Sequence, residues 1–221
     1  MINNRLKKIA YYVEDKDNFI DVGCDHAFLS IYLVKNKKIS KAIASDINIG
    51  PLNIATNNIK KYELEDIIKT KLGDGIEPIE EDINTIIISG MGGITISDII
   101  KRGNNKLKNI KKIIASPNNE QYIVRKTINK FGYYITDEVI IKEKNKFYPI
   151  IVFAKGNKKY IEKELEFGPI FLKERPEEWT EFYNIQIKTL EEVISKLEDK
   201  TIKNKKRKEI KRLTEETSSF S

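Results

Sequence analysis

The chain has 221 residues, of which 40% are hydrophobic and 33% charged, with a formal net charge of +7. This length suits one α/β domain with a smaller appendage, and the composition is that of a folded chain rather than a disordered one. The single cysteine, Cys24, excludes an internal disulfide and a cysteine-rich zinc site, and the lack of a long apolar run or signal-like start predicts a soluble cytoplasmic protein.

Short apolar runs rich in β-branched residues alternate with longer segments of helical periodicity. Strands are expected at Asn18–Val22, Lys41–Asp46, Ile67–Leu72, Thr85–Ser89 and Lys111–Ser116. Helices are expected at Asn4–Val13, Phe28–Lys37, Pro51–Tyr62, Ile94–Gly103 and Glu120–Phe131. This alternation predicts a parallel sheet with helices on both faces.

The pattern changes after Gly132, where two strand-like runs follow each other closely. Tyr133–Ile141 and Phe147–Ala154 are separated by the five polar residues 142–146. So short a connection turns a hairpin and cannot form a parallel crossover, so these strands must be antiparallel. A Rossmann-like sheet that ends in a reversed hairpin is typical of class I methyltransferases that use S-adenosylmethionine, whereas nicotinamide dehydrogenases normally keep the sheet parallel.

Beyond about Lys158 the sequence is helical in character. Phe167-Gly168-Pro169 ends a short helix, and Pro176 can open a long helix that runs to about Lys200. Its apolar residues recur at heptad spacing: Tyr183, Ile187, Leu190, Ile194, Leu197 and Thr201. We expect a sheet domain over residues 1–156 and a small helical, coiled-coil-like domain over residues 157–221.

The last segment of the chain concentrates positive charge. Between Thr201 and Leu213 a single acid, Glu209, accompanies seven basic residues: Lys203, Lys205, Lys206, Arg207, Lys208, Lys211 and Arg212. A solvated helix face and a phosphate-contacting surface both agree with this pattern. Packing on the sheet domain and dimerisation are further possible roles of these helices, and a monomer is slightly favoured.

The loop after the first expected strand reads Asp21-Val22-Gly23-Cys24-Asp25-His26-Ala27. Gly23 allows a tight turn and a close approach of the backbone to a ligand. The loop lacks the further glycines of a dinucleotide fingerprint, and Asp25 would repel a pyrophosphate. S-adenosylmethionine carries a sulfonium and an ammonium instead of phosphates. The acids therefore favour this cofactor, with Asp21, Gly23 and Cys24 as binding residues.

Acidic residues also end the second and third expected strands. Asp46, followed by Ile47, stands where an acid accepts hydrogen bonds from both ribose hydroxyls, with a turn or helix-cap role as the alternative. Asp74-Gly75 stands where, in such folds, an acid commonly meets the exocyclic amine of adenine, with an ordinary Asp-Gly turn as the alternative. Acids at the ends of three successive strands predict a cofactor site that includes Asp46, Ile47, Asp74 and Gly75.

The fourth expected strand ends in Ser89-Gly90-Met91-Gly92-Gly93. Its glycines leave backbone exposed where a flat base could enter, although a flexible turn before the next helix is the alternative. Ser89 and Gly90 are assigned to the cofactor site. The loop differs from the Asn/Asp-Pro-Pro-aromatic motif of many N6-adenine methyltransferases, so we expect a different atom of the base to be presented.

Five segments together carry a resemblance to a known family: Asp21–Leu29, Ala44–Leu52, Leu72–Gly75, Ser89–Gly93 and Ala115–Asn118. By these segments, which span the sheet domain, the chain resembles the bacterial TrmK family of tRNA (adenine-N1)-methyltransferases, which act at tRNA position 22. That family also has a C-terminal helical, coiled-coil-like domain. Three positions depart from the family's usual serine, proline and acid, namely Cys24, Ser30 and Pro149.

The resemblance implies methyl transfer from S-adenosylmethionine to N1 of adenine in tRNA, leaving S-adenosylhomocysteine. Asp25 is the candidate for stabilising the positive charge that develops on the base, and His26 either assists or holds the loop. Met91 and Gly92 would line the base pocket, and Tyr148 could stack on the base. No metal is expected, because no cluster of His, Cys and carboxylates has ligand spacing.

Other functions agree less well with these residues. A nicotinamide-dependent dehydrogenase is disfavoured by the missing glycines and the terminal hairpin. A non-enzymatic RNA-binding module is disfavoured by the intact acids at three strand ends. A methyltransferase that acts on another RNA or on a small molecule is the more serious alternative, since a fold does not determine a substrate.

Overall fold

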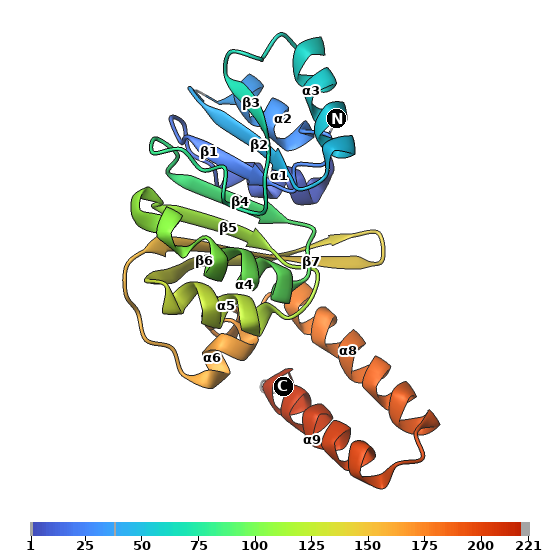
Figure 1. Cartoon of the computed structure of the whole chain (residues 1–221). Coiled ribbons are helices and arrows are strands. Elements are labelled where there is room, and N and C mark those ends of the chain that lie inside the picture. The colour runs from blue at the N-terminus through green and yellow to red at the C-terminus, as the bar shows by residue number, and fades with distance from the viewer. Residues whose placement is uncertain (1, 38, 218–221) are drawn as a thin grey trace. The chain divides into compact units, whose positions relative to one another are not determined.

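The computed structural model describes residues 2–37 and 39–217 (Figure 1). Contacts within the chain divide it into two compact units, Met1–Leu172 and Lys173–Ser221, called here the sheet unit and the helical unit. The boundary expected from the sequence, between residues 156 and 157, places residues 157–172 in the helical domain instead. It stays a prediction about domains.

The sheet unit is built on seven strands in the order β3-β2-β1-β4-β5-β7-β6. Their bounds are β1 Phe19–Val22, β2 Ala42–Asp46, β3 Ile68–Leu72, β4 Thr85–Ser89, β5 Lys112–Ser116, β6 Tyr133–Glu143 and β7 Lys146–Lys155. The first five strands are parallel, and β1 lies between β2 and β4, with Phe19 in register with Ala42 and Thr85. The expected Rossmann-like sheet is confirmed, and each of these five strands begins and ends within one residue of its expected bounds.

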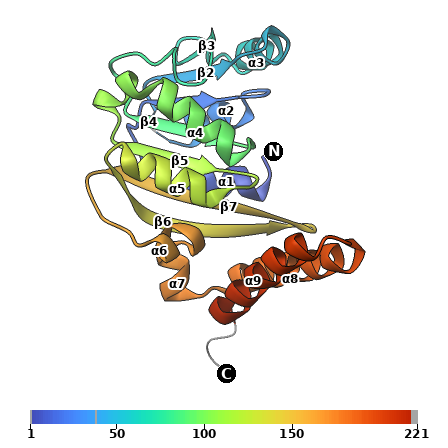
Figure 2. The same cartoon turned by 60° about the horizontal axis from the view of Figure 1, so that its bottom comes forward.

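Helices cover both faces of the sheet because its strands alternate between two cores. Ile20 and Val22 belong to the core beneath α4 and α5, while Phe19 belongs to the opposite core with α1, α2 and α3 (Figure 2). The bounds of these helices are α1 Asn4–Tyr11, α2 Phe28–Asn36, α3 Ile49–Lys61, α4 Gly93–Arg102 and α5 Gln121–Lys130, with a 3-10 helix, η1, at Asn104–Asn109. Strands buried on both faces explain the continuous apolar runs in the sequence.

The reversed hairpin ends the sheet, as expected. β6 and β7 pair antiparallel from Tyr133↔Lys155 to Glu143↔Lys146, so only two residues form the turn instead of five. Lys144 in that turn has a positive φ of 56°, the left-handed conformation that tight hairpins require. β7 then pairs antiparallel with β5. The second strand of the hairpin, rather than the first, therefore lies beside the parallel strands.

Two short helices, α6 (Glu162–Phe167) and α7 (Pro169–Glu174), follow the hairpin. A buried ion pair fixes the first of them: Arg125 Nε lies 2.7 Å from Glu138 Oε1, and Arg125 Nη1 donates to the carbonyls of Leu165 and Glu166. The second oxygen of Glu138 accepts the N–H of Ile170. These bonds tie the segment after the hairpin to α5 and β6.

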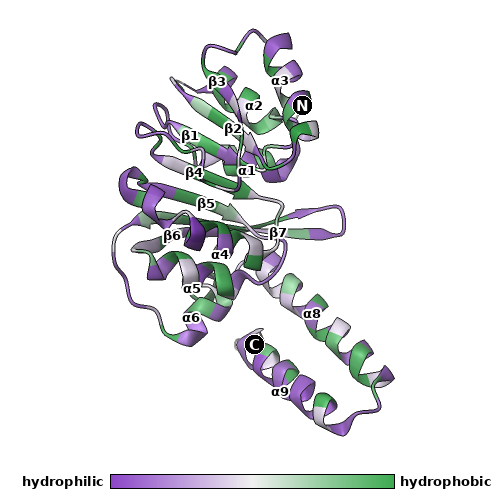
Figure 3. Ribbon diagram, viewed as in Figure 1, coloured by the Kyte–Doolittle hydropathy of each residue, from purple (hydrophilic) through white to green (hydrophobic). Residues whose placement is uncertain are grey.

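The helical unit is a hairpin of α8 (Glu177–Lys196) and α9 (Lys200–Thr217) that pack against each other. The expectation that one helix continues to Lys200 with a heptad seam through Leu197 and Thr201 is wrong. Leu197 is extended, and Asp199 Oδ1 accepts the N–H groups of Thr201 and Ile202, which caps a new helix. α9 is mostly hydrophilic (Figure 3). The coiled-coil character expected for this domain stays a prediction.

Within residues 2–37 and 39–217, no helix combines the length and the apolar character needed to span a membrane.

Candidate active site

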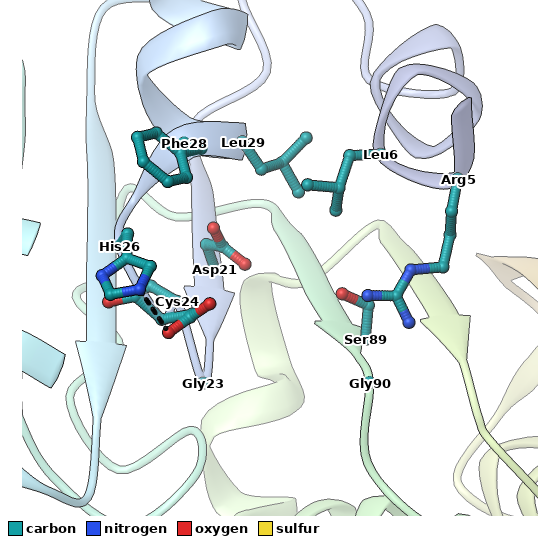
Figure 4. A pocket seen from close by; sticks show the side chains of 11 residues that line it. Arg5, Leu6, Asp21, Gly23, Cys24, His26, Phe28, Leu29, Ser89 and Gly90 are labelled. Carbon is teal, nitrogen blue, oxygen red and sulfur yellow. Dashed lines mark hydrogen bonds and ion pairs between the residues drawn. The ribbon is translucent and has the colours of Figure 1, made fainter. Parts of the chain in front are cut away.

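Three adjoining cavities open along the edge of the sheet where the parallel strands end. The β2 cavity, of about 480 Å³, is bordered by the ends of β2, β3 and β4 and includes Asp46 and Asp74. The α1 cavity, of about 310 Å³, is bordered by α1 and the loop after β1 (Figure 4). The hairpin cavity, of about 540 Å³, includes Phe147 and Tyr148 of β7. Gly90 borders all three, so they meet at this residue, and together they are called the cleft.

The loop after β1 has an unusual backbone. Gly23, Asp25 and Ala27 all have positive φ, between 50° and 69°, and for Asp25 and Ala27 this conformation is strained. The N–H groups of Gly23 and Cys24 both donate to the carbonyl of Ser45 in β2. A Cβ at Gly23 would lie 2.3 Å from Met91 Cε. The flexible Met91 side chain could move away from such a Cβ, so it is the positive φ of 69° that favours glycine at this position.

Asp21 and Cys24 form the buried floor of the α1 cavity. Burial raises the pKa of Asp21 to about 7, against the opposing effect of a hydrogen bond donated by Ser30 Oγ at 3.1 Å. Burial, followed by the nearby charge of Asp21, raises the pKa of the Cys24 thiol. Cys24 is therefore an unreactive neutral thiol, whereas the carboxyl group of Asp21 changes between its neutral and charged forms near neutral pH.

Asp25 and His26 border the same cavity but differ in exposure. The Asp25 side chain is 75% exposed, and its Oδ1 lies 3.4 Å from His26 Nε2. His26 packs beside the Phe28 ring, its carbonyl accepts a hydrogen bond from Asn58 Nδ2, and its buried Nδ1 has no partner among the described residues. Asp25 can therefore reach a ligand, while the contacts of His26 hold the loop.

The predicted acids of the second and third strands border the β2 cavity together with Ile47 and Gly75. Asp46 Oδ1 accepts the N–H of Asn48 at 2.9 Å, so the acid also forms the turn that was its alternative role. Asp74 Oδ1 accepts from Arg102 Nη2 at 2.8 Å. Each carboxylate has further lone pairs with which to accept hydrogen bonds from a ligand.

The loop after β4 is held by the loop after β5. Asn118 donates from its backbone N–H to the carbonyl of Met91 and from Nδ2 to the carbonyl of Gly90, at 2.8 and 2.7 Å. Gly93 N donates to Asn119 Oδ1. Gly92 is the N-cap of α4 and, alone among the predicted site residues, lines none of the three cavities. Sequence reasoning assigned Asn118 no role, although it lies in a segment that resembles the family.

Sequence reasoning also missed Arg5 of α1. Its guanidinium lies over the Tyr148 ring, with Cζ 4.8 Å from the ring centroid, and Arg5 borders both the α1 and the hairpin cavity. One signal could have found it: Arg5 precedes the buried Ile9 by four residues and thus shares a helix face with it. Tyr148, predicted to stack on a base, lies with Phe147 in the hairpin cavity.

The cleft has features that suit S-adenosylmethionine. Carboxylates at the ends of adjacent strands in the β2 cavity can accept from ribose hydroxyls and an adenine amine, and the acids of the α1 cavity favour cationic groups. The shared border of these cavities, at Gly23, Ser89 and Gly90, leaves backbone open beside the place where the two halves of a ligand would join. Within the described ranges, no cluster of three or more His, Cys, Asp or Glu side chains could hold a metal ion.

Comparison with known proteins gives matches across most of the chain. The family model for tRNA (adenine(22)-N(1))-methyltransferase, TrmK, matches residues 19–218. A tRNA (adenine(22)-N(1))-methyltransferase of Bacillus subtilis is 35% identical over 158 residues, which are 71% of this chain and 66% of that relative. This chain thus aligns with slightly less than two thirds of the relative's length.

Solved structures resemble this chain over nearly its full length. A Streptococcus pneumoniae protein in complex with S-adenosyl-L-methionine has a TM-score of 0.88 at 33% identity, covering 96% of this chain and 99% of its own. Mycoplasma capricolum TrmK in complex with S-adenosyl-homocysteine has a TM-score of 0.87 at 29% identity, covering 99% and 98%.

Proposed function

Because the chain belongs to the TrmK family of tRNA (adenine(22)-N(1))-methyltransferases, we propose that it transfers a methyl group from S-adenosylmethionine to N1 of adenine 22 in tRNA. The observation that carries this proposal is the border at Gly90, which is common to the acid-lined cavities and to the aromatic hairpin cavity. A cofactor and a base held on either side of this residue would meet there.

The cofactor is assigned to the β2 and α1 cavities. Asp46 accepts from the ribose hydroxyls, Asp74 from the adenine amine, and the exposed Ile47 packs on the adenine ring. S-adenosylmethionine, when bound, supplies an electrophilic methyl group on its sulfonium. Gly23 and Ser89 flank the place where that group lies, because they border both cavities.

The target base is assigned to the hairpin cavity. N1 lies on the Watson–Crick edge of adenine, so the base has to leave its stack to reach the cleft. Stacking on Tyr148 would offset part of that cost, at roughly 1–3 kcal/mol for a base on an aromatic ring. Met91, predicted to line the base pocket, borders the β2 cavity instead of the hairpin cavity, so it would approach the base from the side of the cofactor, and Gly92 serves as the N-cap of α4.

The chemistry requires positioning more than proton transfer. Neutral N1 has an in-plane lone pair, so no base has to act before the attack, and alignment within the cleft lowers much of the entropic barrier. The product ring is cationic, and the exposed carboxylate of Asp25 stabilises the charge as it develops. His26 keeps the Asp25 loop in place through its contacts with Phe28 and Asn58.

The tRNA partner is assigned a surface on α9. Seven Lys and Arg residues between positions 203 and 212 lie on this helix, and the side chains of Lys205, Arg207 and Lys208 are exposed. Such a cationic face attracts phosphate groups whatever the RNA sequence.

The experiment is methyl transfer from labelled S-adenosylmethionine to unmodified tRNA transcripts, one with adenine 22 and one with guanine 22. We expect labelling of the first transcript only. We also expect Asp46→Ala to raise the dissociation constant of S-adenosylmethionine at least tenfold, because the ribose hydroxyls then have no acceptor. Equal labelling of the two transcripts, or an unchanged cofactor affinity of Asp46→Ala, would contradict the assignment.

A further inference from the structure

Arg5 occupies the junction between the α1 cavity and the hairpin cavity. Its two terminal guanidinium nitrogens would each lie 3.7 Å from a Cβ at Gly90, and its Cζ lies over the Tyr148 ring. Figure 4 shows the side chain extending from α1 toward Ser89, with Asp21 on the opposite wall. A positive group thus lies beside the place where the proposed cofactor and base meet.

The structure gives this cation little inside the protein to bind. Among the described residues, the partner of the Arg5 side chain is the ring of Tyr148. The Nε of Arg5 is buried without a hydrogen-bond acceptor. A buried donor that is left unpaired costs about 1–3 kcal/mol. Such a group is expected where a ligand completes the set of hydrogen bonds.

The other charged groups of the α1 cavity define that ligand. Asp21 and Asp25 lie on the β1 side and Arg5 on the α1 side, with His26 beside Asp25. Acids on one wall and a guanidinium on the other match a zwitterion with one ammonium and one carboxylate. The methionyl end of S-adenosylmethionine is such a zwitterion.

The position along the cleft agrees with this chemistry. Asp46 and Asp74 assign the adenosine end to the β2 cavity, and the shared border at Gly23, Ser89 and Gly90 leads from there into the α1 cavity. The amino-acid end of the cofactor must then lie between the acids of the β1 loop and the guanidinium of α1.

We propose that Arg5 binds the carboxylate of the methionyl group of S-adenosylmethionine, opposite the acids that face its ammonium. This inference rests on the proposed cofactor and adds a binding residue from a helix that precedes the sheet. A guanidinium suits the task because its planar fork can donate two parallel hydrogen bonds to one carboxylate.

The test compares two ligands that differ only in this carboxylate. Dissociation constants of S-adenosylmethionine and of decarboxylated S-adenosylmethionine are measured calorimetrically, without tRNA, for the wild-type protein, Arg5→Ala, Arg5→Lys and Lys7→Ala. Lys7 is an exposed cation on the same helix that borders none of the three cavities, so its variant controls for the loss of charge. Circular dichroism checks that every variant is folded.

We expect the wild-type protein and Lys7→Ala to bind the intact cofactor about 10- to 100-fold more tightly than the decarboxylated one. In Arg5→Ala this ratio should fall to about threefold or less, and Arg5→Lys should retain part of it. Because the ratio compares two ligands on one protein, a general loosening of α1 would not reproduce this result.

Two results would overturn the inference while leaving the proposed function intact. One is an Arg5→Ala variant that keeps the wild-type ratio. The other is a wild-type protein that binds the two ligands with equal affinity, because no group would then recognise the carboxylate. A wild-type protein that binds neither ligand would instead contradict the proposed function itself.

Discussion

The carboxylates of the cleft lie in environments that separate their roles. Asp21 is buried and hydrogen-bonded by Ser30, whereas the Asp25 side chain is 75% exposed beside His26. Asp46 and Asp74 are each oriented by one hydrogen bond, from Asn48 and from Arg102. Oriented acids suit recognition of fixed hydroxyl and amine groups, and an exposed acid can move to meet a base that enters from solvent.

Asp25→Ala tests the charge-stabilising role. We expect the single-turnover rate of methyl transfer to fall about tenfold or more, since the cationic ring loses its nearby carboxylate. The rate is measured at saturating S-adenosylmethionine, because Asp25 also borders the α1 cavity on the side that faces the cofactor's ammonium and its loss should weaken cofactor binding as well. Asp66→Ala, at an exposed acid outside the three cavities, is the control. A near-wild-type rate for Asp25→Ala would leave this residue without a catalytic role.

Asp21 gives the protein a pH dependence with a definite sign. Its pKa is raised from 3.8 to about 7, so the unfolded chain loses this proton at lower pH than the folded one. The folded state binds more protons between those values, and the free energy of unfolding therefore falls as pH rises through this window.

Asp21→Asn should remove that contribution. In urea unfolding at pH 5 and pH 8, the wild-type protein should lose more stability between the two pH values than the variant, by up to a few kcal/mol. The Ser30 hydroxyl can still donate to the amide oxygen of the variant. Stabilities that change in parallel for the two proteins would contradict the raised pKa.

At the scale of elements, periodicity predicted most of the sheet unit. Strands buried on both faces produce apolar runs that end where the strands end, and the five-residue gap at 142–146 required a hairpin. The turn proved shorter because pairing continues to Glu143↔Lys146. The break after Lys196 was missed because apolar spacing continued past a residue, Asp199, whose capping bonds depend on local backbone geometry.

Sequence reasoning reached the candidate site through residues that adjoin strand ends and, by the family resemblance, through Tyr148. Asp46, Asp74 and the glycine loops could be placed because the ends of parallel strands meet at one edge of a sheet. Arg5 and Asn118 could not be, since their place in the cleft depends on how α1 packs and on bonds between two loops. Neither feature leaves a periodic pattern in the chain.

Asn118→Ala tests whether the loop after β5 positions the reacting centre. The variant loses the bond from Nδ2 to the carbonyl of Gly90 and keeps its backbone bond to Met91. We expect methyl transfer to slow about tenfold or more while cofactor affinity stays nearly constant, because small displacements at the reacting atoms have large effects on rate. Asn104→Ala, which removes a similar bond in η1, should leave the rate unchanged. Equal rates in the two variants would show that the loop needs no such support.

At the scale of the whole molecule, we propose that the two units have different roles. The sheet unit contains the complete cleft, from the β2 cavity to the hairpin cavity. The helical unit contains the densest positive charge, on α9. Cofactor binding should therefore depend on the first unit alone, and tRNA affinity on both.

Replacing Lys205, Arg207 and Lys208 with glutamine tests the role of α9. We expect weaker tRNA binding and a smaller dependence of log affinity on log salt, by up to about 0.9 for each phosphate that is no longer neutralised. Affinity for S-adenosylmethionine should not change. The matched control replaces Lys16, Lys60 and Lys61, exposed lysines of the sheet unit, with glutamine. An unchanged salt dependence in the α9 variant would show that these basic residues contact no phosphate and only form a solvated helix face.

The central claim concerns one atom of one nucleotide. It is tested most directly by incubating the protein with an unmodified tRNA transcript and S-adenosylmethionine, then digesting the RNA and locating the methyl group by mass spectrometry. We predict 1-methyladenosine at position 22 and no other methylated nucleoside. A methyl group on another atom, such as N6, at another position, or none at all would contradict the assignment.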